Sequence, residues 1–268
     1  MIFAVFSLFI IQAFAAPRHD LGIIGGENAT LGEFPYIVAV EDCDGMCFVK
    51  CGGVLLTESW ILTAGHCNKD EFFDDLQAHV GITNVEDPNQ QFRHIVKIIV
   101  HPKFDKNLKI SSHDIAVMKL KTPLILNDRV KVAVLPKPNT NESPGNATVT
   151  GWGAIQVEPT KKYPDDLQKA VVPIVEYNDC MAKLKKEVGE DLPEYNNTAV
   201  CTGPYSGGIG PCYGDSGSPL VQNDVVIGLV SWGSKPCAFE GALAVYTKVS
   251  SFIDWIQENI DEQLSFEN

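Results

Sequence analysis

The sequence predicts an all-β protein built as an antiparallel sandwich or barrel. Short runs rich in β-branched and aromatic residues recur along the chain, and clusters of Gly, Pro, Asn and Asp separate them, as in folds of many short strands joined by turns. With 268 residues and 45% hydrophobic content, the chain can bury the core of one large domain or two smaller ones. The expected strands are residues 36–40, 53–56, 94–100, 115–120, 147–151, 170–175, 225–232 and 242–246.

Two segments carry helical patterns instead. Residues 176–188 have a helix start signal at Asn178 or Asp179. Residues 250–263 place apolar side chains on one stripe, which predicts a C-terminal helix packed on the core. The stretch 122–145, rich in Pro, Asn and Lys, is interpreted as a connector between two β-rich halves. The stripe consists of Phe252, Ile253, Trp255, Ile256 and Ile260.

The charge balance limits the partners. The chain has 21 Lys and Arg residues against 34 Asp and Glu residues, which gives a formal net charge of −13 at pH 7. Nucleic acid and anionic membrane surfaces repel a chain of this charge, so we expect neither as a partner. The apolar content also excludes disordered and collagen-like classes.

Residues 1–16 are expected to be a secretory signal peptide. They are apolar almost throughout and end in small residues suited to signal peptidase, namely Ala13, Ala15 and Ala16. A membrane anchor is the alternative, but a run of about 15 apolar residues is shorter than the roughly 20 that a spanning helix needs. We therefore expect a secreted, extracellular protein.

Secretion changes how the eight cysteines are interpreted. In an oxidising compartment they can form four disulfides, and their spacing alone does not choose the pairs. Four sequons also permit N-linked glycans on the surface. The candidate acceptors are Asn28, Asn141, Asn146 and Asn196.

Three short segments carry residues suited to nucleophilic catalysis. Residues 60–67 form an apolar strand that ends in a tight turn at His66, and Asp114 opens a second buried strand. Residues 214–220 surround Ser216 with small residues, which lets backbone N–H groups crowd around the serine. A lone His, Asp or Gly-Ser turn is usually structural. The three together, in the order His, Asp, Ser, are specific.

With these segments the chain resembles the trypsin/chymotrypsin family of secreted serine endopeptidases, from residue 23 to the C-terminal helix. The resemblance rests on IIGG at 23–26, TAGHC at 63–67, DIA at 114–116, GWG at 151–153, GDSG at 214–217 and SWG at 231–233. It implies two antiparallel six-stranded β-barrels followed by a C-terminal helix. The serine protease domain would cover residues 23–268, with its barrel halves at roughly 23–125 and 140–268.

The resemblance also implies a role for each catalytic residue. Ser216 would be the nucleophile, His66 the general base and acid, and Asp114 the group that holds the His66 tautomer. The backbone N–H groups of Gly214 and Ser216 would form the oxyanion hole. His113, beside Asp114, is expected to be a solvated neighbour.

By the same resemblance, removal of a short propeptide at 17–22 would activate the protein. Cleavage before Ile23 would release an amine that pairs with Asp215. Gly22 stands where the family usually has Arg or Lys, so a trypsin-like activator would not recognise this site. The implied disulfides are Cys51–Cys67, Cys180–Cys201 and Cys212–Cys237, with a local bridge Cys43–Cys47 from the two cysteines left over.

The pocket residues favour apolar substrates. The family places the pocket floor at Gly210, and neither it nor Ala244 opposite is acidic, so burial of an Arg or Lys side chain of the substrate would be costly. Gly233 at the entrance leaves room for Phe, Tyr or Leu, and an elastase-like or broad specificity is the second choice. Lys235 and Glu240 are expected near the rim. The implied substrate-binding residues are Gly210, Pro211, Ser231, Trp232, Gly233 and Ala244.

Two functions stay open. The first is an endopeptidase that acts on protein or peptide substrates as a monomer, with protein inhibitors as further partners and without a cofactor or metal. The second is a catalytically weak binding protein on the same fold. Gly22, Pro211 and Ser218 would favour this second function, and Ser218 stands where the family usually has a Gly. The intact set of His66, Asp114 and Ser216 favours the endopeptidase.

Overall fold

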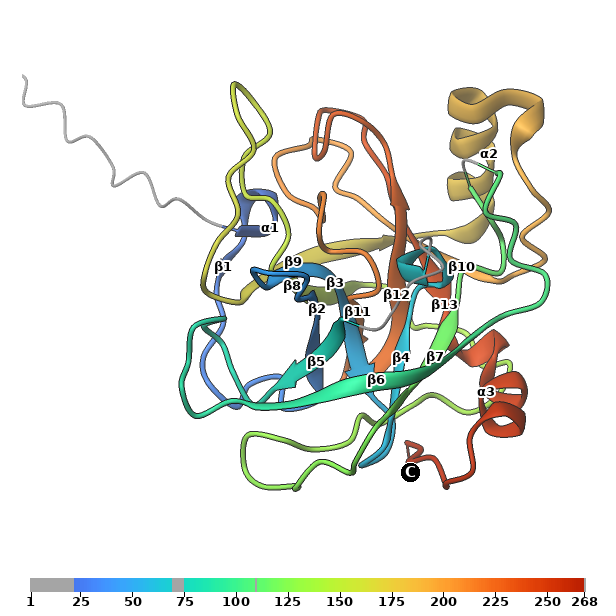
Figure 1. Cartoon of the computed structure of the whole chain (residues 1–268). Helices are drawn as coiled ribbons and strands as arrows, with labels where there is room; N and C mark the ends of the chain where they lie inside the picture. Colours follow the sequence, from blue (N-terminus) through green and yellow to red (C-terminus); the bar gives the residue numbers. More distant parts are fainter. Residues whose placement is uncertain (1–21, 69–74, 109, 268) are drawn as a thin grey trace, which may run out of the picture.

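Two β-barrels form the body of the protein (Figure 1). The computed structural model describes residues 22–68, 75–108 and 110–267, so the expected signal peptide and all but the last residue of the expected propeptide lie outside the described residues. The first barrel closes in the order β2-β3-β4-β7-β6-β5, with every neighbouring pair antiparallel. Its strands are β2 (Ile37–Asp42), β3 (Phe48–Leu55), β4 (Trp60–Thr63), β5 (Leu76–Val80), β6 (Gln91–Val100) and β7 (Ala116–Leu120).

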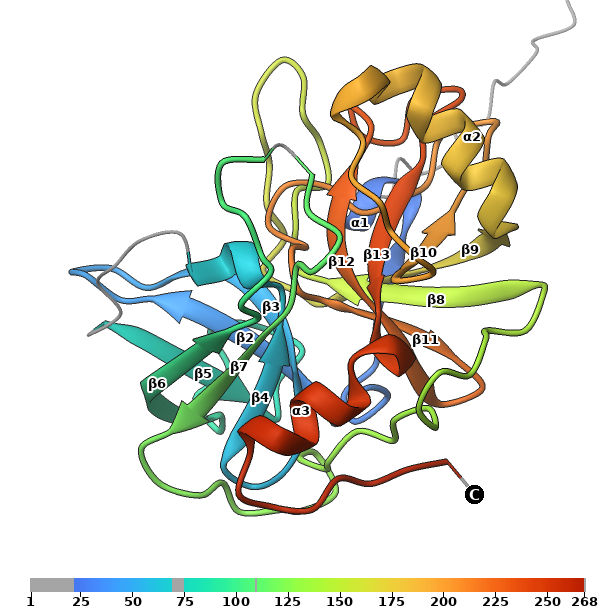
Figure 2. The same cartoon turned by 90° about the vertical axis from the view of Figure 1, so that its right-hand side faces the viewer.

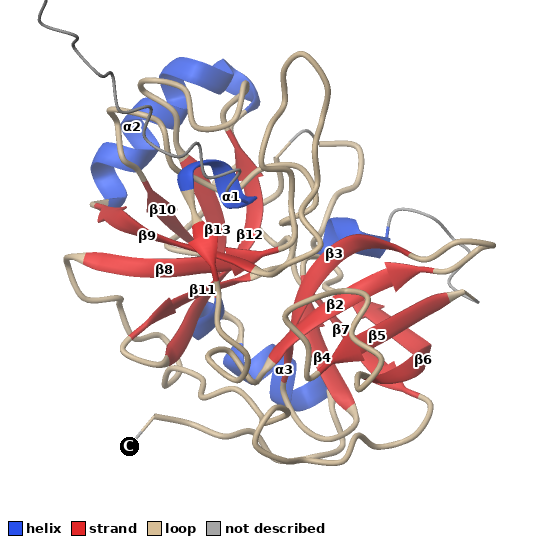
Figure 3. Ribbon diagram, turned by 90° about the vertical axis from the view of Figure 1, so that its left-hand side faces the viewer, coloured by secondary structure: helices blue, strands red, loops and turns tan. Residues whose placement is uncertain are grey.

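The second barrel follows in the chain and lies beside the first (Figure 3). Its strands run β9-β10-β13-β12-β11-β8, and the pairing of β8 with β9 closes the ring. The short strand β1 (Glu27–Asn28) adds to the outside of β9. The strands of this barrel are β8 (Asn146–Gly151), β9 (Gln168–Val175), β10 (Ala199–Thr202), β11 (Pro219–Gln222), β12 (Val225–Gly233) and β13 (Ala244–Lys248). The predicted fold of two six-stranded antiparallel barrels is therefore confirmed.

Successive side chains along a strand point to opposite faces and pack into separate apolar clusters. On β2, Val38 and Val40 face the interior of the first barrel, whereas Ile37 and Ala39 pack outside it against Trp152. A third apolar cluster joins the two barrels to the C-terminal helix. The barrels therefore share a buried apolar junction and act as one body.

Both predicted helices are present, but their first or last residues differ from the predicted ones. Helix α2 (Tyr177–Val188) begins at a cap provided by Glu176, whose Oε2 accepts from the backbone N–H groups of Asn178 and Asp179 at 2.8 and 3.2 Å. The prediction that Asn178 or Asp179 caps the helix is wrong, because the longer Glu176 side chain reaches those same two N–H groups. No helix in the described ranges is long and apolar enough to cross a membrane.

Helix α3 (Ile253–Asn259) is shorter than the predicted span 250–263. A 3-10 turn (Val249–Ser251) precedes it, and the chain is extended at Ile260, where the helix has ended. The predicted apolar stripe still packs as expected, because its residues lie in or against the apolar cluster between the barrels. Figure 2 shows α3 (red) in front of the strands of both barrels.

Four disulfides staple this fold, and they are the four pairs expected from the sequence. One bond ties β3 to the turn that carries His66, and another closes the short loop between β2 and β3. Removal of a native disulfide from a secreted domain typically costs about 2–5 kcal/mol. The pairs are Cys43–Cys47, Cys51–Cys67, Cys180–Cys201 and Cys212–Cys237.

A stack of rings connects the first barrel to α3. His101 lies 4.8 Å from the His113 ring, 5.0 Å from Trp255 and 5.4 Å from Phe252, measured between ring centroids. His113 is thus part of this partly buried stack, and not the solvated neighbour that we expected. Burial, with smaller contributions from His113 and Lys103, lowers the pKa of His101 to about 4.

We predict that this stack makes the protein less stable in acid. The pKa of His101 in the folded chain lies below its value of about 6.5 in the unfolded chain, so the neutral ring stabilises the fold above pH 6.5 and this contribution is lost as the pH falls toward 4. The backbone N–H of Lys103 donates to His101 Nδ1, which a second proton would block. His101→Phe keeps the stack and should reduce the loss of unfolding free energy between pH 7 and pH 5 by about 1 kcal/mol. Urea unfolding at the two pH values tests this, and equal losses in both proteins would contradict it.

Candidate active site

The three residues singled out by the sequence meet at the junction of the barrels. His66 lies in a 3-10 turn (Gly65–Asn68) after β4, Asp114 lies two residues before β7, and Ser216 lies in the loop before β11. Gly65 makes the approach close, because a Cβ there would lie 3.3 Å from Asp114 Oδ1 and 3.1 Å from the backbone nitrogen of Ile115. The His66 turn therefore packs directly against the start of the Asp114 strand.

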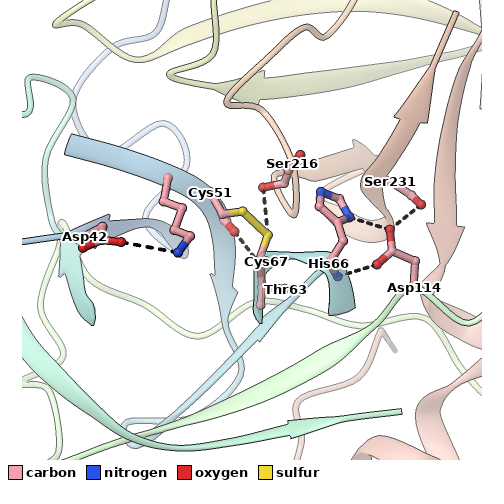
Figure 4. The surroundings of a disulfide bond; sticks show 10 residues. Asp42, Cys51, Thr63, His66, Cys67, Asp114, Ser216 and Ser231 are labelled. Carbon is pink, nitrogen blue, oxygen red and sulfur yellow. Dashed lines mark hydrogen bonds and ion pairs between the residues drawn. A yellow bond between two sulfur atoms is a disulfide. The ribbon is translucent and has the colours of Figure 1, made fainter. Parts of the chain in front are cut away.

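The carboxylate of Asp114 is buried and fully engaged. Its Oδ2 lies 2.7 Å from His66 Nδ1 and accepts from Ser231 Oγ at 2.6 Å, while Oδ1 accepts from the backbone N–H of His66 at 2.8 Å (Figure 4). The Thr247 hydroxyl donates to the Asp114 carbonyl at 2.7 Å. Because Oδ2 accepts from Nδ1, the proton of neutral His66 lies on Nδ1 and its Nε2 is left as a base.

The loop of Ser216 is held by backbone hydrogen bonds. Gly52 of β3 donates to the Ser216 carbonyl at 2.8 Å, and Gly217 donates to the Val230 carbonyl at 2.8 Å. The His66 ring lies between Asp114 and Ser216 (Figure 4). In the described residues no hydrogen bond joins Ser216 Oγ to the ring; in proteins without substrate, such bonds are often long and tighten when substrate binds.

Two N–H groups in this loop have no acceptor within the described part of the chain. The backbone N–H groups of Asp215, Gly217 and Ser218 each donate to a carbonyl, whereas those of Gly214 and Ser216 do not. Gly214 has φ +95°, in the left-handed region that favours glycine. The two N–H groups are therefore available to an oxygen atom brought in by a ligand.

Asp215 is a fully buried carboxylate. It accepts from the backbone N–H groups of Gly153 at 2.8 Å and Cys212 at 2.9 Å, and no ion pair to it is found within the described ranges. Burial raises the pKa of Asp215 to about 7, and the two backbone hydrogen bonds offset only part of this effect. Gly151 and Gly153 make room for it, since a Cβ at either position would lie 2.3 Å from its side chain.

Ile23 is buried in the core of the second barrel. The backbone N–H of Gly210 donates to the Ile24 carbonyl at 3.0 Å, which holds the segment against the loop that precedes Pro211. Ile23 has φ +39°, and a β-branched residue in this left-handed region is strained. In the uncut chain, Ile23 is therefore held in a strained backbone conformation.

Ser218 stands where a glycine is usual in this loop. Its side chain is fully buried and contacts the backbone of β3 at Gly52, where an added Cβ would lie 2.0 Å from Ser218 Oγ. Within the described residues, this hydroxyl has no hydrogen-bond partner. An unsatisfied buried hydroxyl is destabilising, by about 1–3 kcal/mol.

A cavity of about 430 Å³ adjoins His66, Asp114 and Ser216. Among the predicted substrate-binding residues, Pro211, Ser231, Trp232 and Gly233 line it, whereas Gly210 and Ala244 are buried and do not. Sequence reasoning missed the loop between β6 and β7, which carries no motif. The additional lining includes Phe104, Lys106, Leu108, Ile110, Tyr213 and Val230.

Two groups of side chains have the composition of metal ligands. One combines His66 with Cys51 and Cys67, and the other combines His79 with Glu41 and Cys43. Their cysteines are all in disulfides and supply no thiolate, so neither group offers the ligand set that its composition suggests.

All four candidate glycan acceptors lie at exposed positions. Asn141 differs from the others because its Oδ1 accepts from the buried ammonium of Lys248 at 2.6 Å. Use of the four sequons remains a prediction.

A double β-barrel with serine, histidine and a buried aspartate at its junction defines a hydrolase of the chymotrypsin-like fold. Comparison with known proteins agrees. The family model described as Trypsin matches residues 23–256, and the chain belongs to this family.

Its relatives include Trypsin-1 of Astacus astacus, 36% identical over 88% of this chain and 99% of the relative. Kallikrein-1 of Mus musculus is 34% identical over 92% of this chain and 93% of its own, and Serine protease 1 of Homo sapiens is 34% identical over 94% and 95%. The chain is therefore a serine protease of the trypsin family, which acts on protein or peptide substrates.

We predict that Ser231 matters through Asp114. Ser231→Ala removes one of the hydrogen bonds to the charged carboxylate, and bonds of this kind contribute about 1.5–3 kcal/mol. The value of kcat for peptide hydrolysis should fall roughly tenfold. Ser250→Ala is the matched control, because the Ser250 hydroxyl donates to the Thr140 carbonyl away from the cavity. Equal kcat values for the two variants would count against this role.

Proposed function

We propose that this chain is a secreted serine endopeptidase with Ser216 as its nucleophile. His66 Nε2 takes the proton of the Ser216 hydroxyl while Oγ bonds to the scissile carbonyl carbon. The same proton then passes to the leaving nitrogen as the C–N bond breaks, and water repeats the sequence on the acyl-enzyme. The observation that carries the proposal is the bond between His66 Nδ1 and the buried Asp114, because it leaves Nε2 as the base.

The charge that develops on the carbonyl oxygen needs donors. The N–H groups of Gly214 and Ser216 are suited to this role because they have no acceptor in the described part of the chain. Preorganised donors of this kind contribute roughly 3 kcal/mol each to the stabilisation of the transition state. We assign the oxyanion hole to these two groups.

An open strand edge favours an extended peptide substrate. Strand β11 begins at Pro219 opposite Leu229, and among the described strands the part of β12 from Trp232 to Gly233 is paired with β13. Residues 231–233 belong to this end of β12 and line the cavity. A peptide that adds to the edge as a strand would bring its scissile bond to Ser216.

The cavity favours an apolar side chain before the scissile bond. Among the described lining residues the only carboxylate is that of Asp114, which is already engaged with His66. A buried Arg or Lys side chain of the substrate would find no acidic partner, whereas Phe, Tyr or Leu would lie against Pro211 and Trp232. Elastase-like cleavage after small residues is the second candidate, since Pro211 narrows this wall. Trypsin and kallikrein are the names of relatives, and the specificity proposed here rests on the cavity of this chain instead.

Activation by cleavage before Ile23 fits the surroundings of Asp215. Cleavage would relieve the constraint on Ile23 and create an amine, for which the buried Asp215 is the natural partner. Secretion, with a signal peptide at 1–16 and a propeptide at 17–22, agrees with four disulfides. We expect the mature protein to be a monomer that protein inhibitors can bind.

Peptide amides that differ only in the residue before the scissile bond test the proposal. The chain processed before Ile23 should cleave the Phe and Leu peptides faster than the Ala peptide, and the Arg peptide least, with all activity lost in Ser216→Ala. Fastest cleavage of the Arg peptide would overturn the specificity. No cleavage of any peptide by a correctly folded protein would favour the binding protein on a protease fold, for which the buried hydroxyl of Ser218 is the structural motive.

Asp215 gives the uncut chain a pH dependence that processing should remove. The pKa of the folded carboxyl, about 7, lies above its unfolded value near 3.9, so the contribution of Asp215 to the unfolding free energy falls as the pH rises from 4 to 7, by up to roughly 4 kcal/mol, opposite in sign to the contribution of His101. Asp215→Asn should abolish this fall in the uncut chain, and the new amine should abolish it after cleavage. Urea unfolding across this pH range measures both effects. Parallel stability curves for the uncut wild type and Asp215→Asn would exclude this role for Asp215.

A further inference from the structure

The mouth of the cavity carries positive charge on a strongly acidic chain. The chain has 34 acidic and 21 basic residues. Apart from His66 and Asp114, however, the charged side chains among the described lining residues are Lys106 and Lys235. These lining residues therefore do not share the acidic excess of the whole chain.

A second lysine joins Lys235 at this mouth. The Nζ atoms of Lys161 and Lys235 lie 3.8 and 4.6 Å from the centroid of the same ring, that of Tyr213. Tyr213 lines the cavity and directly precedes Gly214. Two ammonium groups are thus held on the ring of one residue of the cavity lining.

The two lysines come from separate loops that project at the same end of the molecule (Figure 1, Figure 2). Lys161 belongs to the loop between β8 and β9, and Lys235 to the loop between β12 and β13. Neither they nor Lys106 form an ion pair with a carboxylate of the described residues, whereas Lys119, Lys169 and Lys248 do. Their charges are therefore available to an acidic group that binds at the cavity.

We propose that this basic pair, Lys161 and Lys235 on Tyr213, selects peptide substrates that carry Glu or Asp close to the scissile bond, with Lys106 reinforcing the same preference. The inference rests on the proposed endopeptidase function and names its substrate class. Lys235 lies two residues beyond the end of β12 and lines the cavity, so a peptide that binds along this end of the strand would pass beside it. Positive charge around a walled cavity raises the local concentration of acidic peptides and disfavours basic ones.

Matched peptides test the proposal. A parent peptide keeps Phe directly before the scissile bond and Gln at the neighbouring positions, and each variant replaces one Gln by Glu, which changes the charge at nearly constant shape. With the chain processed before Ile23, at least one Glu peptide should have a kcat/KM roughly three- to fivefold above the parent at low salt. High salt should reduce this gain, because it screens exposed charges.

Variants assign the gain to the two lysines. The double change Lys161→Gln and Lys235→Gln should bring the Glu-to-Gln ratio close to one while cleavage of the parent peptide continues. The double change to Arg should keep the ratio, since Arg retains the charge and stacks on aromatic rings. Lys137→Gln, outside the cavity lining, is the control for loss of one surface charge and should also keep it.

The outcomes distinguish failure of the acidic preference from failure of the endopeptidase function. Equal kcat/KM for all Glu and Gln peptides, or a gain that survives in the double Gln variant, overturns the acidic preference and leaves the endopeptidase in place. Failure of the wild type to cleave even the parent peptide overturns both. A gain that is lost only in the double Gln variant supports the assignment.

Discussion

The rest of the site depends on the burial of one carboxylate, Asp114, between the two barrels. The first barrel supplies Asp114 itself and the two His66 donors, while the second supplies the hydroxyls of Ser231 and Thr247. Removal of the carboxylate from water is costly unless its oxygens are paired, and here both oxygens are paired. The barrels must therefore dock in one orientation, and this orientation sets the His66 ring in place.

A second buried carboxylate, that of Asp215, is less completely paired than that of Asp114. It accepts from two backbone N–H groups but has no cation partner within the described residues, and its burial raises its pKa. Asp114 is paired in the uncut chain, whereas Asp215 would gain a cationic partner under the proposed cleavage before Ile23. Glycines lie beside both groups: a Cβ at Gly153 would lie 2.3 Å from the Asp215 carboxylate, and one at Gly65 would lie 3.3 Å from Asp114 Oδ1.

Local patterns made much of the fold predictable. Long runs such as β6 and β12 are rich in β-branched residues, whereas β1, β10 and β11 were missed because they have only two to four residues and owe their structure to neighbouring strands. The family motifs located His66, Asp114 and Ser216. The resemblance placed Lys235 near the rim, but its pairing with Lys161 on Tyr213 and the loop between β6 and β7 could not be predicted, because tertiary folding alone brings these loops together.

The central claim is that Asp114 makes His66 a base strong enough to activate Ser216. Covalent labelling by a fluorophosphonate tests this most directly, because the reagent reacts with an activated serine whatever the substrate preference. Mass spectrometry of the chain processed before Ile23 should place the label on Ser216, at a rate orders of magnitude higher than in Asp114→Asn, in which the carboxylate is lost. Equal rates in the two proteins, or no label on Ser216, would contradict the account.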